Sequence, residues 1–168
     1  MVRFSLVITS DRVYRGEKED KITPFVSKYL AEKNRILAYR AVAPNNTSLI
    51  RSAVLDAVSR SDIVIVTGGT GISNRDLSVD VVERIASRRL EGFGEIHRMK
   101  SMESVGLRAI LSRVSAYQIG SSLVIVSPGS LDAVRVTLEI IIEIAEHARE
   151  MAHGVSHWEK HRDERKHS

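Results

Sequence analysis

The chain has 168 residues, of which 43% are hydrophobic and 27% charged, so it is long enough for one domain with a single core. It contains no cysteine, which excludes disulfides, thiolate nucleophiles and cysteine-based zinc sites. The net charge of +4 suits anionic ligands, but aromatic residues make up only 5% and form no base-stacking cluster, so nucleic acid is not an expected partner.

The N-terminal region alternates between strand and helix patterns. Residues 3–9, RFSLVIT, form a short apolar run rich in β-branched residues, which is typical of a buried strand. After a charged loop, Thr23 and Pro24 predict the N-cap and the first position of a helix. Residues 36–43, ILAYRAVA, predict a second strand, which ends before a proline.

The middle of the chain continues the alternation. Asn46 or Thr47 is expected to cap a helix with one apolar stripe. Residues 62–67, DIVIVT, are apolar without alternation, which indicates a strand buried on both faces of a parallel sheet. Beyond the glycine-rich stretch that follows, Ser78 is expected to cap the next helix.

The C-terminal half repeats the pattern with less regularity. Residues 92–111 predict short helices broken near three glycines, and residues 112–127 predict two strands around Gly120. A long helix, strongly apolar on one side, is expected from residue 131 to about residue 151.

This order of elements predicts a single-domain α/β fold with three layers, α/β/α, and a mostly parallel, doubly wound sheet. The domain is expected over residues 1–152, and residues 153–168 are expected to form a basic tail that is disordered or loosely docked. Ligands of such sheets bind at the carboxyl ends of strands. That rule selects three turns, at residues 10–12, 68–71 and 128–130.

No stretch approaches the roughly 20 apolar residues of a membrane span. Asp11 and Arg12 also interrupt the N-terminal apolar run before a signal peptide could form. We therefore expect a cytoplasmic protein that has no membrane partner.

The glycine loop, defined as Gly68, Gly69, Thr70 and Gly71, follows the most apolar strand. Glycine permits positive φ, and consecutive free amides make a concave anion site. The loop has no lysine of a Walker motif, and Asn74 stands where a dinucleotide-binding motif needs its third glycine. A strand-to-helix turn that only needs conformational freedom is the alternative to a phosphate site.

Three acids could serve such a loop. Asp76 lies five residues beyond it and could hold Mg²⁺, which takes one or two carboxylates plus phosphate oxygens; helix capping or pairing with Arg75 is the alternative. Asp80 suits the first turn of a helix without any ligand. Asp11 could bind ligand hydroxyls or a cation, or pair with an arginine of its own loop.

Six segments of the chain, VITSDR, VTGGTGISNRD, EGFGE, MKSMESVG, LSR and SPGS, resemble the molybdenum-cofactor biosynthesis proteins of the MogA/MoaB family in order and spacing. The resemblance covers residues 3–150 and extends to the related domains of gephyrin. It implies an enzyme that binds molybdopterin and Mg-ATP and transfers AMP to the terminal phosphate of the pterin. It also implies assembly as a homotrimer or, in the MoaB branch, a homohexamer.

The resemblance also implies roles for individual residues. Gly68, Gly69, Thr70 and Gly71 would hold phosphate groups, and Asp76 would be the catalytic acid associated with magnesium. The remaining residues implied in the pocket are Ser10, Asp11, Glu95, Ser112, Pro128, Gly129 and Ser130.

One departure from the family pattern bears on catalysis. Active members of the family usually carry Pro-Asp after the second strand, whereas this chain has Pro44-Asn45. Asn45 at this implied catalytic position keeps an oxygen ligand but lacks the charge that would help to bind a cation. A non-catalytic molybdopterin-binding protein of the MoaB branch is therefore the alternative function. Residues 20–24, DKITP, also lack the Ser-Gly often found there.

Overall fold

A computed structural model describes residues 1–154 and is built around one six-stranded sheet of order β2-β1-β3-β6-β5-β4. The strands are β1 (Arg3–Thr9), β2 (Ile36–Ala43), β3 (Ile63–Thr67), β4 (Arg88–Leu90), β5 (Ser115–Ile119) and β6 (Ser122–Ser127). The strands β2, β1, β3 and β6 are parallel, and β5 is antiparallel to both β6 and β4. The predicted α/β class with a mostly parallel sheet is confirmed.

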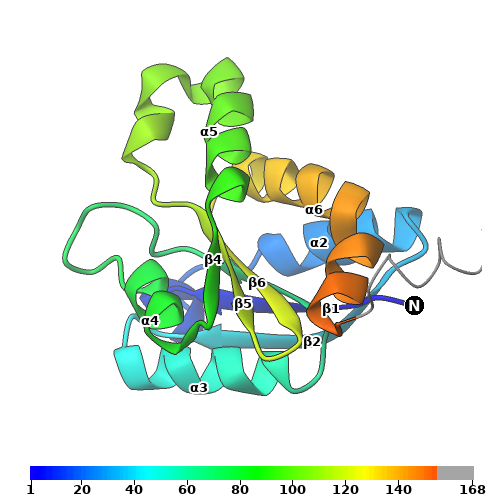
Figure 1. Ribbon diagram of the computed structural model, residues 1–168. Coiled ribbons are helices and arrows are strands. Elements are labelled where there is room, and N and C mark those ends of the chain that lie inside the picture. Colours follow the sequence, from blue (N-terminus) through cyan, green and yellow to red (C-terminus); the bar gives the residue numbers. More distant parts are fainter. Residues whose placement is uncertain (155–168) are drawn as a thin grey trace, which may run out of the picture.

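Helices cover both faces of this sheet (Figure 1). They are α1 (Asp11–Tyr14), α2 (Ile22–Glu32), α3 (Thr47–Val58), α4 (Ser78–Ile85), α5 (Glu91–Val105), α6 (Leu131–Ala152) and the 3₁₀ helix η1 (Gly106–Leu111). Helices α2 and α6 share one apolar cluster with the sheet, while α3 and α4 share the other. The molecule therefore has the three predicted layers.

Strand β3 explains why its sequence shows no alternation. All five of its residues are buried. Ile63 and Ile65 belong to the core beneath α2 and α6, whereas Val64 and Val66 belong to the core beneath α3 and α4. Because both faces of the strand are covered, both sets of side chains must be apolar.

The start of α2 differs from the prediction. The helix begins at Ile22, so Pro24 is its third residue, and Thr23 is not its N-cap. Asp20 supplies the capping bonds instead, because its Oδ1 accepts hydrogen bonds from the amides of Ile22 (3.0 Å) and Thr23 (2.9 Å). The Thr23 hydroxyl in turn donates to Asp20.

Ser78 is not a cap either, because it is the first residue of α4 and is buried. Its hydroxyl shares a hydrogen bond of 2.9 Å with the Thr9 hydroxyl and so ties α4 to the end of β1. Of the two predicted caps for α3, Asn46 is the one used, since its side chain accepts a hydrogen bond from the Leu49 amide (3.1 Å).

Helix α5 runs unbroken through two of the glycines that were expected to interrupt it. A Cβ on Gly94 would lie 2.5 Å from the Val114 carbonyl oxygen, so glycine lets the helix approach the neighbouring chain closely. The helix ends at Gly106, where φ is 62°. The strand β4 and the short helix α1 were not predicted.

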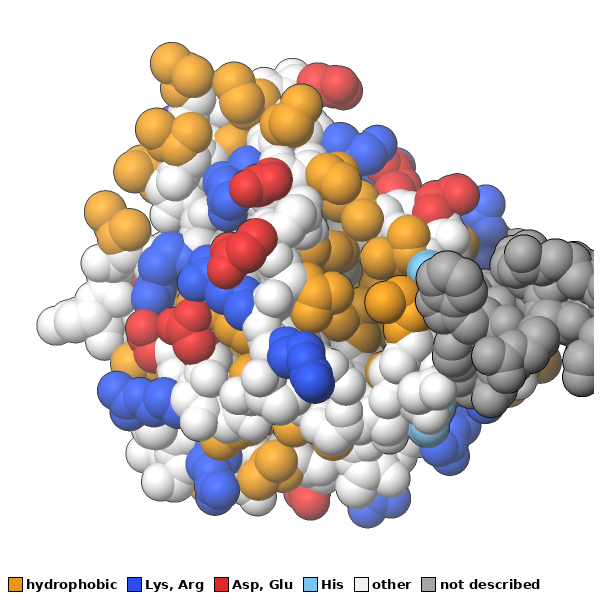
Figure 2. All heavy atoms as spheres, in the orientation of Figure 1, with side chains coloured by type: hydrophobic (Ala, Val, Ile, Leu, Met, Phe, Trp, Pro, Cys, Tyr) orange, Lys and Arg blue, Asp and Glu red, His pale blue; other side chains and the backbone are white. Residues whose placement is uncertain are grey.

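Helix α5 and η1 project from the body of the molecule (Figure 1). Apolar side chains gather over this projection (Figure 2), including Met99, Leu107 and Ile110, which are 66% to 72% exposed. Helix α6 ends at Ala152, and the predicted tail falls, from residue 155 on, outside the described residues. None of the helices within residues 1–154 has the length and apolar character of a membrane span.

Candidate functional site

The three predicted turns lie side by side at one edge of the sheet, where the parallel strands end. The Gly68 amide donates a hydrogen bond to the Ser127 carbonyl (2.9 Å), which joins the turns after β3 and β6. The Thr9 hydroxyl donates to the Thr67 carbonyl (2.9 Å), which joins the turns after β1 and β3. The fold thus assembles the edge at which ligands of such sheets bind.

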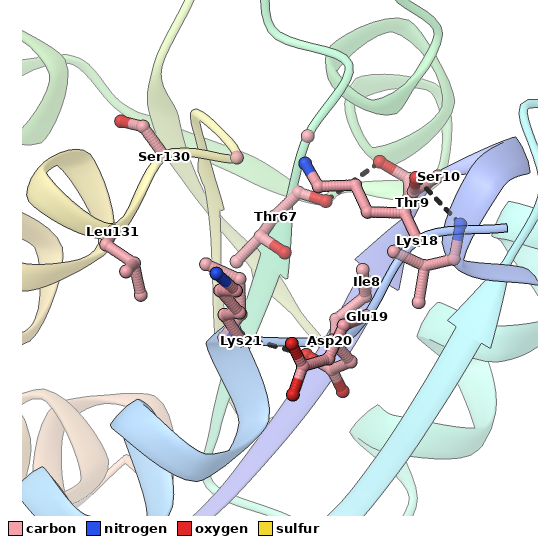
Figure 3. A pocket seen from close by; sticks show the side chains of 14 residues that line it. Ile8, Thr9, Ser10, Lys18, Glu19, Asp20, Lys21, Thr67, Ser130 and Leu131 are labelled. Atoms are coloured by element: carbon pink, nitrogen blue, oxygen red, sulfur yellow. Dashed lines mark hydrogen bonds between the residues drawn. The ribbon is translucent and has the colours of Figure 1, made fainter. Parts of the chain in front are cut away.

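A cavity of about 360 Å³ opens between these turns (Figure 3). Four of the predicted site residues line it, namely Ser10, Gly68, Gly129 and Ser130. The rest of its wall comes from the ends of β1 and β3, the loop before α2 and the start of α6.

Two glycines of the glycine loop are required by packing. Gly68 has φ of 96° and Gly69 has φ of 67°. A Cβ on Gly68 would lie 2.5 Å from the Thr9 carbonyl oxygen, and a Cβ on Gly69 would lie 2.5 Å from the Ser78 hydroxyl. Close approach to β1 and α4 therefore accounts for both glycines, so their presence alone does not indicate a ligand.

The amides of the same loop are nevertheless available. Gly68 donates to β6, but none of the described residues accepts a hydrogen bond from the four amides of Gly69–Ile72. Successive unpaired N–H groups on a tight loop form a concavity that attracts anions. The Thr70 side chain itself is buried, and the Ser112 hydroxyl approaches its Oγ1 at 3.5 Å.

The carboxylate of Asp76 folds back onto this loop. Its Oδ2 accepts a hydrogen bond from the Ser73 amide (3.0 Å), and a Cβ on Gly71 would lie 2.7 Å from the same oxygen. The missing side chain of Gly71 therefore lets the carboxylate lie beside the free amides. Asp76 forms no ion pair with Arg75, which binds Asp11 instead.

Asp11 connects the turn after β1 with the turns after β2 and β3. Its Oδ1 accepts from the Asn45 amide (2.8 Å), and its Oδ2 accepts from Asn45 Nδ2 (3.2 Å) and from Arg75 (2.9 Å). The backbone hydrogen bond from Asn45, followed by the bond from Arg75, holds the pKa of Asp11 below its ordinary value. Its arginine partner therefore comes from the glycine-loop side and not from its own loop.

Arg113 was not predicted as a site residue, yet it holds the loop in shape. Its guanidinium donates to the carbonyls of Gly71 (2.9 Å) and Asp76 (2.8 Å), and its amide donates to the Thr70 carbonyl (2.8 Å). It also forms a two-pronged ion pair with Asp80, at 2.9 and 3.0 Å. The hydrogen bond from Arg113 lowers the pKa of Asp80, whose role is thus to fix the arginine.

A second cavity of about 400 Å³ lies between α5, η1 and the start of α6. Ser112, Pro128 and Ser130 line it, and Ser130 also lines the first cavity, so the two cavities are neighbours at this residue. His97, which was not considered at the sequence level, is buried in this wall, and burial lowers its pKa. Glu95 is exposed on α5 and lines neither cavity.

The donor set fits a magnesium ion that arrives with a phosphate ligand. Within residues 1–154, no group of three or more His, Asp or Glu side chains is placed to hold a metal by itself. Mg²⁺ is commonly bound by one or two carboxylates together with phosphate oxygens. Asp76 offers a carboxylate next to the free amides, whereas Asp80 is already bound to Arg113.

The family model described as "Probable molybdopterin binding domain" matches residues 5–147. The chain belongs to this family. The match spans the glycine loop, Asp76 and Arg113, and it confirms the family that the sequence resemblance implied.

Known members of this family resemble the chain over most of its length. The molybdopterin adenylyltransferase of Pyrococcus furiosus is 36% identical over 157 residues, which cover 88% of this chain and 92% of that protein. Molybdenum cofactor biosynthesis protein B of Bacillus subtilis is 35% identical over 156 residues, covering 90% and 91%. The crystal structure of the tungsten cofactor synthesizing protein MoaB from Pyrococcus furiosus matches with a TM-score of 0.80 at 35% identity, covering 89% of this chain and 98% of that one.

Proposed function

We propose that this molybdopterin-binding domain is a molybdopterin adenylyltransferase that serves molybdenum or tungsten cofactor biosynthesis. It takes molybdopterin and ATP with Mg²⁺, transfers AMP to the terminal phosphate of the pterin and releases pyrophosphate. The observation that carries the proposal is the row of free amides at Gly69–Ile72 with the Asp76 carboxylate beside it. The name of its relative from Pyrococcus furiosus supports the same reaction, and the name of its relative from Bacillus subtilis supports a role in molybdenum cofactor biosynthesis.

The reaction needs no protein nucleophile. An oxygen of the pterin phosphate attacks the α-phosphorus of ATP, while the bond from that phosphorus to the oxygen bridging to the β-phosphate breaks and pyrophosphate leaves. The protein has to position two phosphate groups and offset their charge. The amides of Gly69–Ile72 donate to phosphate oxygens, and Arg113 keeps those amides in place through the carbonyls that it binds.

Other residues of the site hold the substrates. Magnesium, held by Asp76 and phosphate oxygens, would supply charge neutralisation at the reacting phosphates. Ser10 lines the first cavity, and Asp11 with Asn45 fixes the neighbouring turns. The remaining predicted contacts are assigned to the two cavities and the adjoining face of α5: Glu95, Ser112, Pro128, Gly129 and Ser130.

A second candidate function is molybdopterin binding without catalysis. Asn45 directs both its backbone and its side-chain N–H groups at Asp11, so the pair carries one negative charge where two carboxylates would carry two. A cation site that included this pair would be correspondingly weaker.

The reaction is tested by incubating the protein with molybdopterin, ATP and Mg²⁺ and measuring adenylylated pterin and pyrophosphate. Asp76→Asn should lower the transfer rate roughly a hundredfold, because it removes charge that stabilises the transition state, while ATP affinity changes by less than about threefold. Asp56→Asn, on the exposed face of α3, is the matched control. Equal losses of rate and affinity would contradict the catalytic role of Asp76, and absence of product from the unmodified protein would favour the binding-only function.

We also infer that the protein is cytoplasmic and acts as a homotrimer or homohexamer. The exposed apolar side chains over α5 and η1 support self-association, because contiguous exposed apolar surface commonly marks a protein interface (Figure 2).

A further inference from the structure

Two lysines that belong to none of the motifs face the first cavity. Lys18 and Lys21 line it, and Figure 3 shows both side chains extending into it, with Thr67 between them in this view. Neither lysine forms an ion pair with any residue in the range 1–154. Their charges are therefore available to a ligand.

The acids of the same loop do not cancel these charges. Asp20 is bound by Arg40 at 2.6 Å and by the residues at the start of α2, so it is already paired. Glu19 is the other acid at the cavity. Because Arg40 offsets the charge of Asp20, two lysines face one remaining carboxylate, that of Glu19, and the cavity favours an anion.

The base of the cavity contains a buried polar group without a partner. Thr67 is only 1% exposed, and its hydroxyl forms no hydrogen bond among the described residues although the residue lines the cavity. Buried hydroxyls are normally hydrogen-bonded, because leaving one unpaired is unfavourable. Thr67 lies among the residues that line the cavity (Figure 3), so a ligand atom placed against this wall would supply the missing partner.

The rest of the wall is suited to the flat part of a ligand. Ile8, Ile22 and Leu131 present apolar side chains, and the 22-residue helix α6 begins at the cavity, so its positive end faces the same space. The volume of about 360 Å³ lies within the range of about 300–1,000 Å³ that is usual for small-molecule sites.

We propose that Lys18, Lys21 and Thr67 form a subsite for a phosphorylated heterocycle. The two ammonium groups hold phosphate oxygens, the Thr67 hydroxyl makes a hydrogen bond to the ligand, and the apolar wall contacts the ring. The subsite depends on the proposed function only for the identity of the heterocycle, which is either ATP or molybdopterin.

The test measures binding of ATP, adenosine and molybdopterin by isothermal titration calorimetry. The double variant Lys18→Gln/Lys21→Gln should bind one of the two phosphorylated ligands at least roughly thirtyfold more weakly, because two charge-assisted hydrogen bonds are lost. Adenosine, which lacks phosphate, should be unaffected. The control Lys28→Gln/Lys33→Gln removes the same charge from exposed positions on α2 and directly after it, and should change affinity by less than about twofold.

Thr67→Val separates a ligand contact from a structural role. Valine has the same shape without the unpaired hydroxyl, so the melting temperature of the ligand-free protein should rise or stay unchanged, while affinity falls roughly fivefold or more. A lower melting temperature with unchanged affinity would mean that the hydroxyl serves the fold, and would overturn its part in the subsite.

The remaining outcomes identify the ligand and decide the subsite. Lysine-dependent affinity for ATP alone assigns the subsite to the nucleotide, and dependence for molybdopterin alone assigns it to the pterin. Wild-type affinity of the double variant for both ligands would overturn the proposal. If binding depends on the lysines but no adenylylated pterin forms, the proposed reaction is wrong while the subsite is supported. If the double variant binds and reacts like the unmodified protein, the reaction is supported while the subsite is wrong.

Discussion

Asn45 and Asp11 link the turns after β1 and β2. The asparagine donates two hydrogen bonds to a carboxylate that is also bound by Arg75. An aspartate at position 45 would keep the backbone bond but would place a second carboxylate where Asn45 now has an N–H donor. The amide at this position therefore suits a site without a resident cation.

Replacing Asn45 tests this link. Asn45→Asp should lower the free energy of unfolding near neutral pH, because a hydrogen bond is lost and two carboxylates repel each other. Repulsion raises the pKa of the pair, so the destabilisation should shrink as the pH falls and one carboxyl binds a proton. Urea unfolding near neutral and near acidic pH, with and without Mg²⁺, measures the effect. Stability equal to that of the unmodified protein under all conditions would show that the carboxylates do not meet.

The ion pair between Asp80 and Arg113 gives a second pH-dependent contribution to stability. Because Arg113 lowers the pKa of Asp80 below the ordinary 3.8, the stabilisation is present above that value and is lost as the pH falls through the lower pKa of the folded state. Asp80→Asn should cost up to about 1 kcal/mol near neutral pH, since both side chains are partly exposed and the attraction is screened.

Urea unfolding of Asp80→Asn between neutral pH and about pH 3 checks this expectation. The difference in unfolding free energy from the unmodified protein should narrow below pH 3.8. Asp56→Asn, whose carboxyl group is on the exposed face of α3, provides the control. A difference that stays constant over the whole range would rule out the pH dependence assigned to Asp80.

At the scale of elements, two residues at the start of α2, Asp20 and Thr23, are candidates for the N-cap, and mutation can distinguish them. Asp20→Ala should destabilise the protein by about 1–2 kcal/mol, because it removes two capping bonds and the partner of Arg40. Thr23→Ala should cost about half as much, because the Asp20 cap survives. Thermal unfolding followed by circular dichroism compares the two variants. The opposite order would restore Thr23 to the capping role that the sequence pattern predicted.

Helices and strands with a clear hydrophobic pattern were predictable from the sequence, whereas those that form because of tertiary contacts were not. The five buried residues of β3 form an apolar run that is visible in the sequence. Strand β4 consists of Arg-Arg-Leu and is a strand because it pairs with β5, which no local pattern reveals. Gly94 weakens helix propensity locally, but its close contact with Val114 favours a continuous α5.

The candidate site also contains features that the sequence predicts and features that only the fold reveals. The meeting of three turns followed from the rule for parallel strands, and Asp76 followed from its spacing to the glycine loop. Arg113 lies about forty residues from the loop that it holds in shape, so although it belongs to the LSR segment of the resemblance, only the fold reveals its contacts. The link from Arg75 to Asp11 likewise spans 64 residues of sequence.

For the whole molecule, the exposed apolar surface of α5 and η1 predicts self-association. Leu107→Gln/Ile110→Gln should shift the proposed trimer or hexamer to smaller species, since each large aliphatic side chain that an interface buries contributes about 1.5–3 kcal/mol. Size-exclusion chromatography with light scattering measures the mass. Leu49→Gln, an exposed apolar position on α3, is the control. An unchanged mass in the double variant would place any interface elsewhere.

The outer strand β4 also limits how copies of this protein can meet. An unpaired edge strand can pair with a strand of another chain and so lead to aggregation. Natural proteins prevent this with edge strands that are short and charged. Strand β4 has three residues, two of which are arginines. If the β4 strands of two copies paired, their arginines would lie close together and repel each other. This edge therefore disfavours the growth of fibrils by sheet extension and favours contacts between the helices of neighbouring copies.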